Sequence, residues 1–167
     1  RVPGFAQLNH TPFDRCCFKH IIHAVGPRWI DGKHNEPELL YNAYYSSLEL
    51  TVEHQCHSIG FPLISSGIFG YPVDAAWKRA LTACGDYLDK HQDVSLDIVF
   101  AAINDETIKA GRKALANGCA ARYKIAERSD WKALDMPTQY DAFVLRRTFT
   151  SQQMAALHRG NIPQQME

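Results

Sequence analysis

The segment "PLISSGIFGYP", residues 62–72, decides the fold of this chain. Its apolar beginning ends at two serines, two glycines lie in the stretch that follows, and a helix-like pattern begins directly after it. A short apolar run bounded by turn residues is typical of a buried strand, and glycine permits backbone angles that other residues avoid. The segment therefore predicts a strand that continues through a tight, uncharged loop into a helix.

Outside this segment, further apolar runs alternate with helical patterns. Residues 5–8, 18–25 and 96–103 are predicted to form strands, as are residues 58–64. Between and after them, apolar residues recur at helical spacing in three stripes: Leu40, Tyr44, Leu48 and Val52; Val73, Trp77, Leu81, Cys84 and Leu88; Ile108 and Leu115. Strands that alternate with helices predict a largely parallel sheet covered on both faces. Such sheets bind ligands beyond the carboxyl ends of their strands, which is where the glycine-containing loop is expected.

Capping residues indicate where two of the helices begin. Asn35 is expected to cap the first helix, with Pro37 in the first turn and Glu38 completing a capping box. Asn104 or Asp105 is expected to cap the third helix. Because Asn104 follows a predicted strand, it is expected at the same edge of the sheet as the glycine-containing loop.

Composition and charge argue against several classes of protein. With 46% hydrophobic residues among 167, the chain can form one compact core. Its 18 basic and 18 acidic residues cancel, which argues against binding to nucleic acid or to a membrane surface. No apolar run approaches the roughly 20 residues of a membrane span. Five cysteines without the spacing of a disulfide framework favour a reducing compartment, so a cytoplasmic location is expected.

The pattern of alternating strand and helix signals in the sequence ends between residues 120 and 128. Residues 1–122 hold all the alternating strands and helices, whereas residues 123–167 hold one strand candidate, residues 142–145, and one short helix candidate, residues 151–158. We therefore predict that residues 123–167 begin an accessory C-terminal unit.

The loop has the composition of an anion site. Its glycines allow several backbone N–H groups to point to one place, and the following helix adds the positive end of its dipole. Each hydrogen bond to a charged oxygen contributes roughly 1.5–3 kcal/mol, so three or four could hold a pyrophosphate without lysine or arginine. Phe69 and Tyr71 would then flank a sugar. An ordinary strand-to-helix turn is the alternative that these residues alone leave open.

Two motifs in order, "HIIHAVGPRW" at residues 20–29 and "IGFPLISSGIFGYPVDAA" at residues 59–76, resemble the macro domain family. The resemblance spans about residues 4–120 and includes the polar turn at residues 104–107. It implies a three-layer α/β/α fold around a mixed sheet, and binding of ADP-ribose. Many members of the family hydrolyse ADP-ribosyl esters on proteins or deacetylate O-acetyl-ADP-ribose.

The resemblance also implies which residues contact the ligand. Phe69 matches the position that flanks the distal ribose, and Ile103 and Asn104 match the end of the last strand, near adenine. The family often has an aromatic residue at that strand end, and this chain has none. No cofactor and no metal is implied. The family's second phosphate-binding loop is matched by Ser65, Ser66, Gly67, Ile68, Phe69 and Gly70.

Other parts of the family pattern are expected upstream of this chain. Residues 4–7 correspond to a strand that follows the family's opening strands, its adenine-contacting acid, its asparagine pair and its first glycine-rich loop. The chain is therefore expected to be incomplete at its N-terminus, and its catalytic residues stay unassigned. ADP-ribose or an ADP-ribosylated protein is the expected partner, and an ester hydrolase is the expected full-length protein. The alternatives are a non-catalytic ADP-ribose reader and a phosphatase that acts on ADP-ribose phosphates.

Several residues that suggest chemistry have a simpler interpretation. Residues 54–57, "HQCH", lack a second pair of metal ligands, and histidines there suit the end of a helix. His23 has apolar neighbours and is expected to be a core histidine and not a general base. Trp77 belongs to a helix stripe and is expected in the core. A triad of Ser66, His23 and Asp74 is rejected because the G-x-S-x-G pattern is absent.

Overall fold

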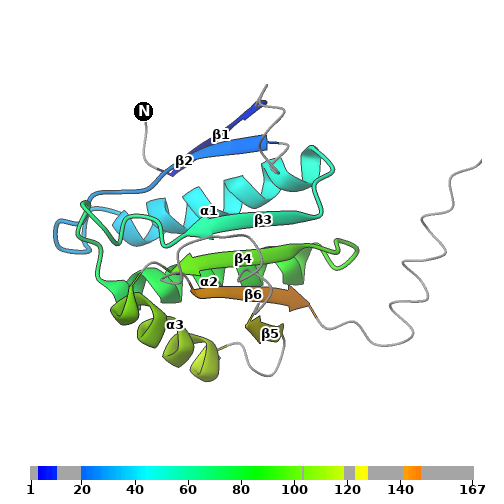
Figure 1. Ribbon diagram of the computed structural model, residues 1–167. Helices are drawn as coiled ribbons and strands as arrows, with labels where there is room; N and C mark the ends of the chain where they lie inside the picture. The colour runs from blue at the N-terminus through cyan, green and yellow to red at the C-terminus, as the bar shows by residue number, and fades with distance from the viewer. Residues whose placement is uncertain (1–3, 11–19, 103, 119–122, 128–140, 148–167) are drawn as a thin grey trace, which may run out of the picture.

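The computed structural model describes residues 4–10, 20–102, 104–118, 123–127 and 141–147, and Figure 1 shows their arrangement. Among the described residues, no helix combines the length and the apolar character that crossing a bilayer requires. The elements, in chain order, are β1 (Phe5–His10), β2 (His20–Val25), α1 (Glu36–Glu53), β3 (Ser58–Pro62), α2 (Val73–Lys90), β4 (Asp97–Ala102), α3 (Asp105–Gly118), β5 (Tyr123–Glu127) and β6 (Asp141–Arg147).

The strands form two sheets. One contains β3, β4, β6 and β5 in that order, and the other is the antiparallel pair of β1 and β2. Among the described strands, only the pairing of β3 with β4 is parallel, because β6 runs antiparallel to both β4 and β5. The mixed sheet of the predicted fold class is therefore present. The expectation of a largely parallel sheet was wrong, because alternation of strands and helices does not reveal the partner of a strand as distant as β6.

The last two described strands belong to the main sheet. β6 pairs with β4 from Ile98↔Leu145 to Ala102↔Asp141, and β5 pairs with the outer side of β6. These strands come from the predicted accessory unit, yet they extend the sheet of residues 1–122. The division between residues 122 and 123 stays a prediction, and the helix candidate at residues 151–158 lies outside the described residues.

The core lies between the sheet and the helices α1 and α2. Tyr44 of α1 and Trp77 of α2 both pack against Phe100 of β4, with ring centroids 6.1 and 5.2 Å away. Ile98, Phe100 and Ala102 are buried in the same cluster, because alternate residues of a strand face one side of the sheet. The helix stripes predicted from the sequence contribute the other large members of this core, which include Leu40, Leu48, Leu81, Cys84, Leu88 and Leu115.

The two helix starts differ from each other. At α3, the Thr107 N–H donates to Asn104 Oδ1 at 2.8 Å, which confirms Asn104 as the cap. At α1, Asn35 occupies the cap position with a left-handed backbone (φ 61°), and its side chain makes no capping hydrogen bond. The predicted capping box of Asn35 and Glu38 was therefore wrong, although Pro37 does lie in the first turn. The carboxylate that organises this helix start is that of Glu36.

Candidate functional site

The glycine-containing loop joins the carboxyl end of β3 to the start of α2, as Figure 1 shows. Ser65 and Gly70 both have left-handed backbone angles, with φ of 65° and 66°. The Tyr71 N–H donates to the Ser65 carbonyl at 3.0 Å, and the Gly70 N–H donates to the Gly67 carbonyl at 2.9 Å. These bonds fold residues 65–71 into a compact turn directly before the helix.

The middle of the loop leaves backbone donors available. The N–H groups of Gly67, Ile68 and Phe69 have no acceptor among the residues that the structure describes. A Cβ atom added at Gly67 or at Gly70 would meet no heavy atom within 4 Å, so the space beside the loop is open. Consecutive free N–H groups next to open space and a helix N-terminus form an arrangement that favours an anion.

A buried tyrosine fixes the point at which β3 becomes the loop. The hydroxyl of Tyr44, on α1, accepts the Ile64 N–H at 2.8 Å and donates to the Pro62 carbonyl at 3.3 Å. Burial raises the pKa of Tyr44, so the hydroxyl keeps its proton and can donate. The Ser66 hydroxyl donates to the Leu63 carbonyl at 2.8 Å and closes the next turn.

Gly26 packs closely against the start of the glycine-containing loop, at Ile64 and Ser65. A Cβ atom on Gly26 would lie 2.5 Å from Cγ2 of Ile64 and would overlap the Ser65 hydroxyl oxygen. Only glycine allows this approach, because real Cβ contacts are never so short. The Ser65 hydroxyl oxygen is buried and has no hydrogen-bond partner among the described residues.

A second loop, residues 26–35, contacts the first. The Trp29 N–H donates to the Phe69 carbonyl at 2.9 Å. The Trp29 ring meets the Tyr71 ring edge-on, with centroids 4.6 Å apart. The two loops therefore support each other at the carboxyl edge of the sheet.

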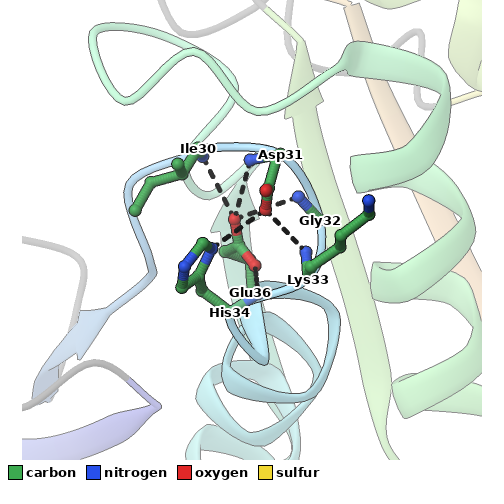
Figure 2. A network of polar contacts seen from close by, with 6 residues as sticks. All are labelled: Ile30, Asp31, Gly32, Lys33, His34 and Glu36. Carbon is green, nitrogen blue, oxygen red and sulfur yellow. Dashed lines mark hydrogen bonds and ion pairs between the residues drawn. The ribbon is translucent and has the colours of Figure 1, made fainter.

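Figure 2 shows how Glu36 organises the end of this second loop. One carboxylate oxygen accepts the N–H groups of Ile30, Asp31 and Gly32 at 3.1 to 3.2 Å, and the other accepts the His34 N–H at 2.6 Å. Burial raises the pKa of Glu36, but the backbone donors outweigh it and lower the pKa to about 2. Sequence reasoning missed this role, because acidic residues are common in the first turn of any helix.

Side chains of Asp31, His34 and Glu36 also offer possible metal ligands within 4.8 Å of one another. However, the Glu36 carboxylate already accepts the four backbone N–H groups. Asp31 Oδ1 lies 2.9 Å from the Lys33 N–H and 2.9 Å from His34 Nδ1. These contacts favour a carboxylate that organises the backbone over a cation site.

The loop residues that the sequence singled out differ in exposure. Ile68 is 98% exposed and Phe69 is 41% exposed, so both side chains are open to a ligand. Tyr71 is only 2% exposed and its ring packs on Trp29. Its proposed contact with a ribose stays a prediction, one that this burial does not favour. Of the adenine-proximal pair, Ile103 lies outside the described residues, and Asn104 is exposed where it caps α3.

Three other expectations can be compared with the structure. Trp77 is 1% exposed and donates to the Thr107 carbonyl at 3.0 Å, which confirms it as a core residue. His54 occupies the C-cap position of α1, as expected for the end of a helix. His23 is exposed, so the expectation of a core histidine was wrong. Alternation along β2 directs His23 away from the side on which Ile22 and Ala24 are partly covered.

The structure also contains a cavity that sequence reasoning did not identify. Its volume is about 520 Å³, and it lies at the N-terminus of α1, beside the residues that Glu36 organises. No local pattern predicts it, since its wall combines one loop with faces of two helices. It is lined by Gly32, Lys33, Asn35, Pro37, Glu38, Tyr41, Asn42 and Arg79.

Comparison with known sequences identifies relatives of the chain. The family model described as "Macro domain" matches residues 5–80. A macro domain-containing protein of Xanthomonas campestris is 50% identical over 98 residues, which are 59% of this chain and 54% of that protein. An O-acetyl-ADP-ribose deacetylase of Citrobacter rodentium is 36% identical over 113 residues, 68% of this chain and 62% of that protein. The chain thus spans about half of the length of curated relatives that it matches.

Solved structures show the same architecture. An Oceanobacillus iheyensis macrodomain with ADP superposes with a TM-score of 0.59 at 28% identity, covering 69% of this chain and 58% of that one. A Trypanosoma brucei macrodomain in complex with ADP-ribose gives a TM-score of 0.56 at 27% identity, covering 68% of this chain and 46% of that one. The α/β fold class predicted from the sequence is confirmed, and residues 5–80 of this chain match the macro domain family model.

Proposed function

We propose that residues 65–70 bind the diphosphate of ADP-ribose, and that the full-length protein hydrolyses O-acetyl-ADP-ribose or ADP-ribosyl esters on proteins. The observation that carries the proposal is the set of free N–H groups of Gly67, Ile68 and Phe69 beside open space. These N–H groups have no acceptor among the residues that the structure describes.

The energetics of such a site are sufficient for binding. Each hydrogen bond from a backbone N–H to a charged phosphate oxygen contributes roughly 1.5–3 kcal/mol. The N-terminus of α2, which begins at Val73, adds a favourable dipole interaction of about 0.3–1 kcal/mol. Phe69, exposed beside these donors, offers an apolar face to a sugar ring.

The relatives support a hydrolytic role. Proteins of Citrobacter rodentium, Cronobacter sakazakii and Citrobacter koseri that match this chain are named O-acetyl-ADP-ribose deacetylases. In the proposed reaction, the oxygen of water bonds to the acyl carbon, the bond from that carbon to the ribose oxygen breaks, and the released ribose oxygen takes a proton of that water to become a hydroxyl. The loop contributes by binding the diphosphate and orienting the ribose for that attack. No residue of this chain is assigned as the general base.

Two measurements on the full-length protein test the proposal. Calorimetry with ADP-ribose should show stoichiometric binding, and a turnover assay with O-acetyl-ADP-ribose should release acetate. Binding without turnover would identify a reader and would reject the hydrolase. Release of inorganic phosphate from an ADP-ribose phosphate, without acetate release, would favour the phosphatase instead. No heat with ADP-ribose would reject the proposal as a whole.

A further inference from the structure

The cavity at the N-terminus of α1 is distinct from the residues assigned to ADP-ribose. It measures about 520 Å³, within the range of small-ligand pockets. Two cations from separate elements, Lys33 of the second loop and Arg79 of α2, lie in its wall. The first two turns of α1 also line it, with Pro37, Glu38 and Tyr41.

Neither cation is neutralised within the described part of the chain. Arg79 is half-buried, and no carboxylate among the described residues forms an ion pair with it or with the Lys33 ammonium. Figure 2 shows the Lys33 side chain extending away from the Glu36 carboxylate. A partly buried guanidinium is normally paired, and its planar donors match a carboxylate in two-point fashion. Glu38 adds one carboxylate to the lining, which leaves an excess of one positive charge. The wall therefore favours an anionic group.

The remaining lining indicates a polypeptide more than a small inorganic anion. The amides of Asn35 and Asn42 each provide a donor and an acceptor, the combination that backbone peptide groups require. The Tyr41 hydroxyl donates to Asp86 at 3.1 Å, which holds its ring in place as an apolar surface. A lone phosphate would leave both the amides and most of the volume unused.

The cavity lies close to the loop assigned to ADP-ribose. Arg79 lies on α2, the helix that begins two residues after Tyr71 and directly follows the loop. On the other side, the loop that carries Lys33 is bonded to Phe69 through Trp29. A polypeptide that carries ADP-ribose on a side chain would continue past this edge of the domain.

We propose that the cavity binds an acidic segment of the ADP-ribosylated polypeptide, with Arg79 and Lys33 receiving its carboxylates. The proposal rests on the proposed function for the identity of the polypeptide. The affinity of the cavity for an acidic peptide, however, does not require ADP-ribose to be present. The two can therefore be measured separately.

Fluorescence anisotropy with a labelled glutamate-rich peptide, and with its glutamine counterpart, tests the proposal on the whole chain. The glutamate peptide should bind and the glutamine peptide should not. Arg79→Ala should weaken binding at least about tenfold, and Lys33→Ala should weaken it as well. The control is Lys78→Ala, which removes an exposed cation from the same helix outside the cavity and should change affinity by less than about twofold.

Several results would overturn this assignment. They are absence of binding, equal binding of the glutamine peptide, equal loss in Lys78→Ala, or competition by inorganic phosphate at the same concentration as peptide. Circular dichroism establishes that Arg79→Ala is folded, and Lys33→Ala, at an exposed position, provides a second variant. Calorimetry with ADP-ribose should be unchanged in both variants. Peptide binding by a chain that fails to bind ADP-ribose would leave the cavity assigned and reject the proposed function.

Discussion

The hydroxyl of Tyr44 accepts the Ile64 N–H at 2.8 Å and donates to the Pro62 carbonyl at 3.3 Å. One side chain of α1 therefore satisfies both backbone groups at the point where β3 ends. Tyr44 is fully buried, and its ring packs edge-on against Phe61 with centroids 5.0 Å apart. The rigid helix thus sets the position at which the candidate ADP-ribose loop leaves the sheet.

Replacing Tyr44 by phenylalanine should destabilise the fold and loosen the loop. The ring would still fill its place, but a partly buried N–H and a carbonyl would lose their partner, which costs about 1–3 kcal/mol. The thermal midpoint should fall by several degrees, at about 2–4 °C per kcal/mol for a chain of this size. Affinity for ADP-ribose should fall with it.

Tyr45→Phe is the matched control for this variant. Tyr45 is a neighbour on the same helix, and its hydroxyl has no hydrogen-bond partner among the described residues. Differential scanning fluorimetry should therefore show little change for Tyr45→Phe. Equal thermal midpoints for the Tyr44 variant and the wild type would contradict the role given to this hydroxyl.

Valine at Gly67 should remove ADP-ribose binding and preserve the fold. No heavy atom lies within 4 Å of a Cβ added there, so the new side chain occupies the open space in which the phosphates would bind. Loss of one or two charge-assisted hydrogen bonds corresponds to a reduction in affinity of about 10-fold to more than 100-fold.

Gly60→Val provides the comparison, because Gly60 also has open space around it but lies within β3, outside the loop. Calorimetry should show wild-type affinity for the Gly60 variant and loss for the Gly67 variant. Unchanged affinity in Gly67→Val would show that the ligand binds elsewhere.

Replacing Gly26 by alanine should lower the stability of the fold and should not alter a ligand contact directly. The added methyl group would overlap Ile64 and the Ser65 hydroxyl, and overpacking of this kind costs about 1–3 kcal/mol. Chemical denaturation should show a lower unfolding midpoint than wild type, whereas Gly60→Ala should not. A Gly26→Ala variant as stable as wild type would mean that the two loops separate easily, and the close approach would then have no structural importance.

Periodicity made the helices predictable from sequence, because each helix must bury one face. Leu40, Tyr44 and Leu48 recur every four residues and are all fully buried. The start of α1 was not predictable in the same way. Which carboxylate binds which N–H depends on the path of the preceding loop, and that path brings four N–H groups to Glu36 and none to the side chain of Asn35.

Contacts between residues far apart in the chain were the second feature that could not be predicted from the sequence. His23 has apolar neighbours, but Ile21 and His23 lie on one face of β2 and both are exposed, whereas Ile22 and Ala24 on the other face are partly covered. The pairing of β6 with β4 joins residues about 40 positions apart, and local composition carries no signal for it. The same reason explains why the cavity, built from a loop and two helices, could not be predicted.

The depressed pKa of Glu36 predicts a specific acid sensitivity. Its value in the folded chain is about 2, compared with an ordinary value of 4.5, because backbone N–H groups favour the charged form. As the pH falls, the Glu36 carboxylate therefore binds a proton at a higher pH in the unfolded chain than in the folded chain. The stabilising contribution of Glu36 is complete above about pH 4.5 and is lost progressively between pH 4.5 and 2.

Glu36→Gln isolates this contribution. The NH2 group of glutamine would replace one acceptor oxygen, so that a hydrogen-bond donor would face backbone N–H donors. The variant should therefore unfold at a lower temperature at pH 7. The difference in thermal midpoint between wild type and variant should shrink as the pH is lowered from 4.5 toward 2. Glu38→Gln, at an exposed position in the same first turn of α1, should follow the wild type throughout. A difference that stays constant across this window would show that the Glu36 carboxylate is not held in its charged form by the loop.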